Sequence, residues 1–399
     1  MLFTRRVFCS SRHTVCVNAA GQALERFPSF SRTSISVRNQ SRYTSTAAVE
    51  PVPVAPGDLP EELQAHQVSF DFDNIPVIDL GKAEQGAAAR SSLLSELRRA
   101  TEEIGFMTVI NHGVPFETKE AMLTKSREFF NLPQEMKDPF KQDRETVAGY
   151  VQNGMEHLGN IHKGDTSGRT DCKETFDMSM FEYAPENEHA DAWRWQSKES
   201  FPERDVPGFT HAMETYQAAA LTLGMHLVDL IGEALFCSNS TAHNGKSKIL
   251  WNACHRKTVC HHRLLHYPPL RNYTSEISTG AHIDYGLLTI LATDAVSGLQ
   301  VLNSKKNLWI HVFPCADGLV INFGHMLSAW TGGRAKAAVH RVVNVHAGKP
   351  RFSSPFFFRP ALNTVLNPRD FDPEAEISTT TCREVLKMFY ERSSLLTKT

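Results

Sequence analysis

The chain has 399 residues, 41% of them hydrophobic, which is enough for one large domain or two modest ones. The formal net charge is −2, and no block rich in Lys and Arg lies outside the first fifty residues, which argues against nucleic acid as a partner. The sequence contains no run of eighteen apolar residues, so we expect no membrane span.

The first fifty residues differ in composition from the rest. They hold seven arginines against two glutamates, a net charge of +5 that leaves −7 for the remainder. The segment is rich in Ser and Thr and lacks the long apolar core of a secretory signal. Such a composition is typical of an organelle transit peptide. We therefore expect residues 1–45 to direct the protein to the mitochondrion, with the plastid or the cytoplasm as runner-up. The alternative is a disordered tail without a targeting role.

Cysteine usage points to a reducing compartment. Two of the eight cysteines, Cys9 and Cys16, fall in the predicted transit segment. The other six form no CxxC pair and are too sparse for a disulfide scaffold.

A linker and a mixed region follow the leader. Residues 46–72 begin with a Pro- and Ala-rich stretch that is typical of a linker. The region 73–205 is then predicted to be mixed in structure. We expect strands at 75–80 and 106–110, helices at 87–104 and 117–131, and irregular loops over 140–205.

The second half changes from helix to strand. Residues 206–262 are predicted to hold a long helix at 207–236 and a polar insertion. Over 263–365, short runs of Val, Ile, Leu and Phe alternate with Gly, Asn, Asp and Pro, which predicts a β-sandwich or barrel. Residues 366–399 are predicted to end in a helix at 383–396. The fold class is therefore mainly β with flanking helices.

Two residues that can bind a metal precede an apolar run. His282 and Asp284 are two positions apart, and on a strand such residues point to the same face. Two histidines and one carboxylate on one side of an octahedral ion leave three positions open, as in non-haem iron(II) oxygenases. A His-x-Asp pair alone is weak evidence. His189 and Asp191 form another, in a polar stretch that we interpret as a solvated loop.

A third ligand and an anion-binding pair come later in the chain. His340 begins a strand-like run and is the preferred third metal ligand. Arg351 and Ser353 follow, again two positions apart. A guanidinium can donate two hydrogen bonds to a carboxylate, and a hydroxyl can add a third. A dicarboxylate could thus bind the metal at one end and Arg351 and Ser353 at the other.

Other residues compete for these roles. His311, His325 and His346 lie in the predicted β region but lack either the strand context of His340 or its spacing to Arg351. A zinc site is the alternative interpretation of a second cluster, Cys254-His255, Cys260-His261-His262 and His266. Its spacing matches no familiar finger or ribbon pattern, so we interpret it as a His-rich segment leading into a strand.

These motifs together resemble a known family. The N-terminal half carries the stretches 75–80 (IPVIDL), 104–106 (IGF), 111–115 (NHGVP), 129–133 (FFNLP), 149–150 (GY) and 173–174 (KE). The C-terminal half carries 264–268 (LLHYP), 282–289 (HIDYGLLT), 298–301 (GLQV), 340–343 (HRVV) and 351–357 (RFSSPFF). Over about residues 73–365 the chain resembles the 2-oxoglutarate/Fe(II) dioxygenases of the isopenicillin N synthase-like group, which includes the plant gibberellin and flavonoid oxidases.

The resemblance implies a fold and a reaction. The core would be a double-stranded β-helix, a jelly roll of two sheets with the metal in its mouth. His282, Asp284 and His340 would hold Fe(II), and Arg351 and Ser353 would bind 2-oxoglutarate. Tyr267 falls where some members have a tyrosine that touches this co-substrate. Members commonly have Asp after the Asn-x-Gly step, whereas here His325 follows, which affects local hydrogen bonding but no metal ligand.

The expected reaction is oxidation of a small molecule, with O₂ and 2-oxoglutarate consumed and succinate and CO₂ released. Hydroxylation is the default outcome, and desaturation and demethylation are the others. Ascorbate is a candidate reductant, and we expect a monomer. Two alternatives stay open: an iron oxidase of the same fold that does not consume 2-oxoglutarate, and a catalytically silent jelly roll that binds a small molecule. Succinate release coupled to O₂ uptake separates these functions.

Overall fold

The computed structural model describes residues 51–54, 71–142, 148–155, 171–180, 200–236, 245–255, 258–269, 277–343 and 348–392. The predicted transit peptide, the His189/Asp191 pair and His346 lie outside these residues. Residues Ala47–Thr399 form one compact unit.

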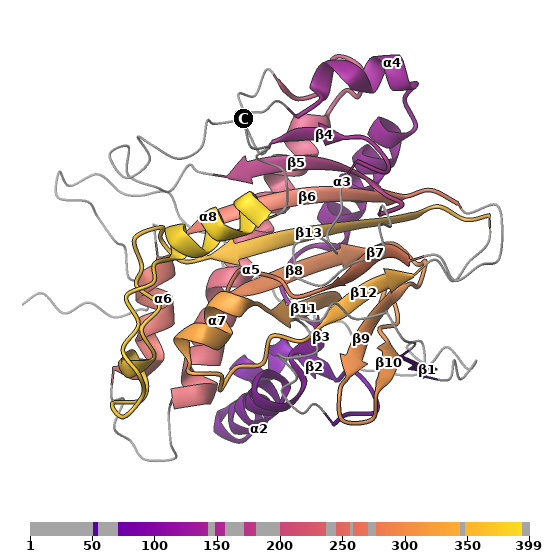
Figure 1. Cartoon of the computed structure of the whole chain (residues 1–399). Coiled ribbons are helices and arrows are strands. Elements are labelled where there is room, and N and C mark those ends of the chain that lie inside the picture. The colour runs from indigo at the N-terminus through magenta and orange to yellow at the C-terminus, as the bar shows by residue number, and fades with distance from the viewer. Residues whose placement is uncertain are drawn as a thin grey trace, which may run out of the picture. The chain divides into compact units, whose positions relative to one another are not determined.

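Two β-sheets make up its centre (Figure 1). The smaller has the strand order β1 (Val52–Pro53), β10 (Leu308–His311), β9 (Leu299–Asn303), β12 (His340–Val343) and β7 (Ile277–His282). The larger has the order β2 (Val77–Asp79), β3 (Phe106–Ile110), β11 (Leu319–Phe323), β8 (Leu288–Thr293), β13 (Arg351–Arg359), β6 (Val259–Tyr267), β5 (Glu174–Met180) and β4 (Gly149–Val151). All the pairings are antiparallel except that of β2 with β3. This is the sheet-rich architecture of a double-stranded β-helix, as predicted.

The larger sheet has an inward and an outward face. Leu265 and Tyr267 of β6 and Phe106 of β3 pack against the smaller sheet, together with Val301 and Val342 of that sheet. Because strand side chains alternate in direction, the residues between them point the other way, toward the helices. Both faces are buried along most strands, and the inward face carries polar residues such as Thr289, Asn322 and Arg351 among the apolar ones.

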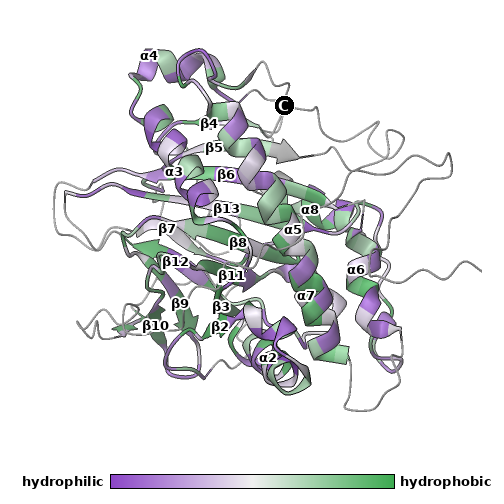
Figure 2. Ribbon diagram, turned by 180° about the vertical axis from the view of Figure 1, so that it is seen from behind, coloured by the Kyte–Doolittle hydropathy of each residue, from purple (hydrophilic) through white to green (hydrophobic). Residues whose placement is uncertain are grey.

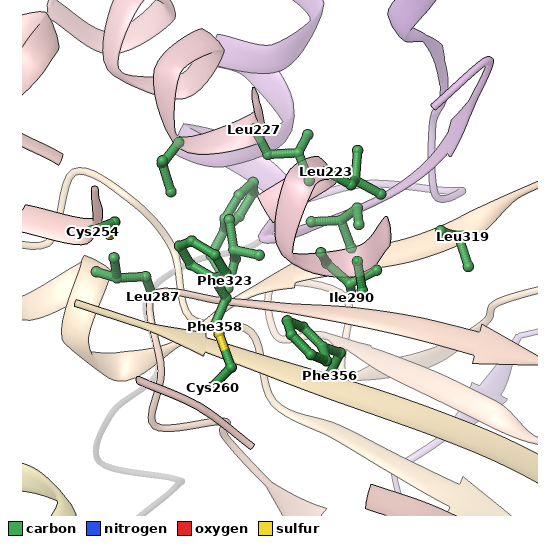
Figure 3. Close-up of a cluster of buried hydrophobic side chains, with 14 of the residues drawn as sticks. Leu223, Leu227, Cys254, Cys260, Leu287, Ile290, Leu319, Phe323, Phe356 and Phe358 are labelled. Atoms are coloured by element: carbon green, nitrogen blue, oxygen red, sulfur yellow. The ribbon is translucent and has the colours of Figure 1, made fainter. Parts of the chain in front are cut away.

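Helices α3 (Phe116–Phe130) and α5 (Phe209–Phe236) cover the outward face (Figure 2). The described helices are α2 (Ala87–Arg99), the π-helix η3 that continues it (Ala100–Ile104), α3 (Phe116–Phe130), α4 (Gln134–Lys137), α5 (Phe209–Phe236), α6 (Ile249–Cys254), α7 (His325–Trp330) and α8 (Cys382–Arg392). Leu223 and Leu227 of α5 pack onto Phe356 and Phe358 of β13 in one core cluster (Figure 3).

Helix α5 is also long and apolar enough, by length and composition, to cross a membrane. In this structure it is a core helix, since its residues at helical spacing, such as Met213, Ala220 and Leu227, are buried against the sheet and α3. The start predicted from the sequence lies within two residues of the observed one.

One prediction about the N-terminal half is wrong. The segment 140–205 is expected to be irregular loops, but it contains β4 and β5, which extend the larger sheet beyond β6. The alternation in Glu174–Met180 is between buried polar residues, such as Thr175 and Asp177, and buried apolar residues, such as Phe176 and Met178. This polar–apolar alternation is the usual signature of a strand. The prediction overlooked it because the run is short and the segment around it is polar.

Candidate metal and co-substrate site

The two predicted histidine ligands lie opposite each other on neighbouring strands. His282 is the last residue of β7 and His340 is the first of β12, and the two are register partners. Their ring centroids are 4.2 Å apart. Asp284 was predicted to share a strand face with His282, but β7 ends at His282 and the aspartate lies in the loop after it. A backbone hydrogen bond of 2.7 Å from His325 N to Asp284 O holds this loop.

The donor atoms of the three side chains converge. The Nε2 atoms of His282 and His340 each lie 3.7 Å from Asp284 Oδ1. One ligand atom from each residue lies within 4.8 Å of the others. Within the described residues this is the one group of His, Cys, Asp or Glu side chains found to be arranged for a metal ion.

Hydrogen bonds leave these donor atoms available. His282 Nδ1 donates to Gly280 O at 2.8 Å, and His340 Nδ1 donates to Ala338 O at 3.1 Å. With the proton on Nδ1, each Nε2 presents a lone pair toward the shared centre. This is the tautomer that a metal-binding histidine requires.

The carboxylate of Asp284 is oriented in the same way. Its Oδ2 accepts hydrogen bonds from Thr289 Oγ1 at 2.5 Å and Asn322 Nδ2 at 2.7 Å, which leaves Oδ1 to face the histidines. The sequence motifs assigned no role to Thr289 and Asn322. Both lie within these motifs, Thr289 at the end of 282–289 and Asn322 in the Asn-x-Gly step before His325. They lie on the inward face of β8 and β11 and are register partners there.

The electrostatics suit a cation. Burial, and secondly the neighbouring His340, lower the pKa of His282 well below 6.5, so the imidazole is neutral. Burial alone would raise the pKa of Asp284, but the two histidines and the hydrogen bonds from Asn322 and Thr289 hold it below its ordinary value. Neutral imidazoles and an ionised carboxylate are the states in which these groups bind metals.

The predicted anion-binding pair is buried nearby on β13. Arg351 Nη1 donates to Ser353 Oγ at 3.1 Å, and Arg351 Nε donates to Val296 O at 3.2 Å. The guanidinium carbon lies 5.0 Å from the centre of the Tyr267 ring. In the described part of the chain, no carboxylate forms an ion pair with Arg351, although the residue is only 5% exposed.

The other candidate metal ligands from the sequence do not join this site. His311 packs beside Gln300, with 3.3 Å between His311 Nε2 and the Gln300 amide nitrogen, and His325 is an exposed residue at the start of α7. Among the described residues of the second cluster, no group of metal ligands is formed. Successive side chains of β6 point in opposite directions, so His261 contacts Asp177 while His262 contacts Ser354.

The fold and this site together define a jelly-roll oxygenase of the non-haem iron type. Comparison with known families agrees: residues 75–204 match the N-terminal domain of the non-haem dioxygenases described from morphine synthesis. Residues 254–360 match the 2OG-Fe(II) oxygenase superfamily.

Individual relatives share a low sequence identity with this chain, but the similarity extends over most of its length. A 1-aminocyclopropane-1-carboxylate oxidase of Dictyostelium mucoroides is 27% identical over 335 residues, which cover 75% of this chain and 85% of the relative. The 2-oxoglutarate-dependent dioxygenase tropC of Talaromyces stipitatus is 28% identical over 313 residues, which cover 76% of this chain and 91% of that relative. The structure of a full-length Neurospora crassa protein in complex with alpha-KG and thymine superimposes with a TM-score of 0.65 at 21% identity, over 82% of this chain and 99% of that one.

The chain therefore belongs to the 2OG-Fe(II) oxygenase superfamily. It is a 2-oxoglutarate/Fe(II)-dependent dioxygenase, an oxidoreductase that acts on small molecules.

Proposed function

We propose that His282, Asp284 and His340 hold the catalytic Fe(II), and that Arg351 and Ser353 bind the distal carboxylate of 2-oxoglutarate beside Tyr267. The chemistry of the donor set supports the first part, because two histidine Nε2 atoms and one carboxylate oxygen form the facial triad that non-haem Fe(II) uses. The remaining side of the ion is left for co-substrate and O₂.

The observation that carries the assignment is Arg351. A buried guanidinium without an acidic partner is costly, and its natural complement is a carboxylate that it can bind through two hydrogen bonds. Ser353 Oγ, 3.1 Å from Arg351 Nη1, is placed to add a third. Within the described residues the protein supplies no such carboxylate, and 2-oxoglutarate has one at the end opposite its metal-chelating group.

The chain's own residues position and shelter the reaction. Bound Fe(II) supplies O₂ activation coupled to the oxidative decarboxylation of 2-oxoglutarate to succinate and CO₂. Gly280 O and Ala338 O fix the histidine tautomers, while Thr289 and Asn322 orient Asp284. The Phe106 ring packs edge-on against His340, with ring centroids 5.2 Å apart, and helps to exclude water. Hydroxylation of a C–H bond is the expected outcome, with desaturation or demethylation as the related ones.

The decisive experiment measures succinate. Purified full-length protein with Fe(II), ascorbate and 2-oxoglutarate is screened against a small-molecule library, with His282→Ala as the blank. We expect at least one compound to stimulate succinate formation with matching O₂ uptake in the wild type alone. If none exceeds the blank, or if O₂ is consumed without succinate, the proposed function is wrong.

A substitution at Arg351 tests the assignment of the co-substrate site separately. Arg351→Lys keeps the charge but loses the two-pronged geometry, so we expect the KM for 2-oxoglutarate to rise by roughly tenfold or more. Arg204→Lys, at an arginine whose side chain is 92% exposed, is the matched control and should leave that KM unchanged.

We also propose that residues 1–45 direct the enzyme to mitochondria. The support is their composition, with seven arginines and a single acidic residue among them. Fused to a fluorescent reporter, this segment should carry it into mitochondria, while a version with the arginines changed to glutamine should not. A reporter that stays in the cytoplasm or enters plastids would contradict the proposal.

A further inference from the structure

The inward face of the larger sheet carries a second buried arginine, Arg359, at the far end of β13 from Arg351. The register of β13 with β6 runs without a shift from Ser353 to Arg359. Residues separated by an even number of positions on a strand share a face, so Arg351, Ser353, Phe357 and Arg359 all point inward. Arg359 is only 8% exposed.

Nothing in the described part of the chain neutralises this guanidinium. Its Nε has no hydrogen-bond partner there, and no described carboxylate forms an ion pair with it. Its nearest described aromatic contact is the Phe357 ring, whose centre lies 5.9 Å from the guanidinium carbon. Burying an unpaired charge is costly, so the site calls for an anion that the described residues do not supply.

The other described charged groups of β5 and β6 on this face contact groups of opposite charge or hydrogen-bond partners. Asp177 Oδ1 accepts hydrogen bonds from Arg263 Nε and His261 Nε2, both at 2.6 Å. Burial is the largest influence on His261 and lowers its pKa, which favours the neutral ring.

A second pair lies at the start of β5, where Lys173 Nζ is 2.9 Å from Asp171 Oδ2. With Asp177 in contact with Arg263 and Asp171 with Lys173, Arg359 is a described arginine on this face that no described carboxylate contacts. A carboxylate is an anion that a guanidinium can bind through two parallel hydrogen bonds.

Arg359 lies beside the metal-binding loop, away from the co-substrate end. A Cβ placed on Gly286, two residues after Asp284, would lie 3.6 Å from Arg359 Cγ. Phe357 is the register partner of Thr289, which hydrogen-bonds Asp284. Arg359 comes eight positions after Arg351 on the strand, a span of about 26 Å. One molecule of 2-oxoglutarate cannot reach both, so they serve different ligands.

We propose that Arg359 binds a carboxylate of the primary substrate, so that this enzyme oxidises a small carboxylic acid. The inference rests on the proposed function, since it takes the triad as the reacting centre. The Arg359 guanidinium holds the acid group beside the Phe357 ring, and the rest of the substrate reaches toward the centre that His282, Asp284 and His340 define.

A binding test needs no knowledge of the substrate. Full-length protein loaded with Mn(II) and saturating 2-oxoglutarate is unfolded by heat with acetate or its neutral counterpart acetamide, at constant ionic strength. A ligand that binds only the folded state raises the unfolding midpoint. We expect acetate to raise it more than acetamide does in the wild type and in the exposed control Arg204→Met, and expect this difference to vanish in Arg359→Met. Equal protection by the two probes, or an acetate effect that survives in Arg359→Met, would overturn the proposal.

The substrate found by the succinate screen gives the second test. It should carry a carboxylate, and Arg359→Met should raise its KM by roughly tenfold or more. Its methyl ester should show the same kcat/KM in wild type and variant. A neutral or cationic substrate, or an unchanged KM, would refute the carboxylate site. A wild type that forms no succinate refutes the proposed function instead, and the acetate test remains separate because it measures unfolding.

Discussion

At the residue scale, the two oxygens of Asp284 have different tasks. Oδ1 faces His282 and His340, while Oδ2 is held by Asn322 and Thr289. Both hydrogen bonds are buried, so the carboxylate cannot rotate without leaving two polar groups unsatisfied. The metal-binding geometry therefore depends on residues that touch no metal.

Asn322→Ala removes one of these restraints. We expect a roughly 10–100-fold weaker affinity for Fe(II), because groups that orient metal ligands contribute effects of this size. Anaerobic titration of the apoprotein with Fe(II) measures it. Asn131→Ala, at an exposed position at the end of α3, should bind iron as the wild type does. If the two variants bind alike, the role given to Asn322 is incorrect.

Gly324 allows this loop to approach the sheet. A Cβ at this position would lie 2.3 Å from Gly286 O and 2.9 Å from Asp284 O. Both contacts are with backbone atoms, which side-chain rotation cannot relieve. The glycine is thus required by the closeness of two backbones beside Asp284, and the His325 that follows it contributes its backbone N–H to the same loop.

At the scale of elements, the contact between α5 and β13 depends on a missing side chain. Gly224 of α5 faces Phe358, and a Cβ there would lie 2.4 Å from Phe358 Cδ2. Phe358 is fully buried in the cluster beneath α5 (Figure 3). Helix and sheet can therefore move no closer, and a larger residue must push the ring or the helix away.

Gly224→Ala should destabilise the protein by about 1–3 kcal/mol, the usual cost of overpacking a core. The higher helix propensity of alanine, worth up to about 1 kcal/mol, offsets only part of this. Urea unfolding gives the free energy of unfolding of each variant. Thr222→Ala, on the exposed side of the same helix, should change it little. A Gly224→Ala protein as stable as the wild type would show that the α5 contact is looser than described.

At the scale of the whole molecule, buried neutral histidines join the layers. His262 on the outward face of β6 lies between α5 and β13. Its Nε2–H donates to Ser354 Oγ at 2.7 Å, and its Nδ1 accepts from Gln217 Nε2 at 3.2 Å. Burial, and then the charge of His261, lower its pKa from 6.5 to about 3. Burial, and then Lys119, likewise lower the pKa of His112 to about 4.

These histidines make stability depend on pH. Below pH 6.5 the unfolded chain takes up protons at both sites, while the folded protein takes them up only near pH 4 and pH 3. The unfolded state thus binds more protons in this window, and stability falls as pH falls, by roughly 1.4 kcal/mol per pH unit for each histidine. Urea unfolding between pH 7 and pH 5 should show this slope, and His262→Gln should make it shallower. An unchanged slope in that variant would mean that His262 is not the buried neutral group inferred.

Sequence patterns determined the parts of this protein that depend on neighbouring residues. Helical spacing located α2, α3 and α5, and short apolar runs located the strands from β6 onward. The order of His282, Asp284, His340, Arg351 and Ser353 pointed to an iron and 2-oxoglutarate site, because each residue type has its own ligand chemistry. These properties follow from local periodicity and side-chain chemistry, which one sequence contains.

Tertiary structure alone decided the rest. That Asp284 lies beyond β7, and that Thr289 and Asn322 hold it, depend on pairings between distant segments. So does the burial of Arg359 without a described acidic partner. Register fixes which face each side chain occupies, and register is set by strands far apart in the chain. The sequence therefore indicated what chemistry this protein performs, and the fold showed which further residues orient the metal site and which could select its substrate.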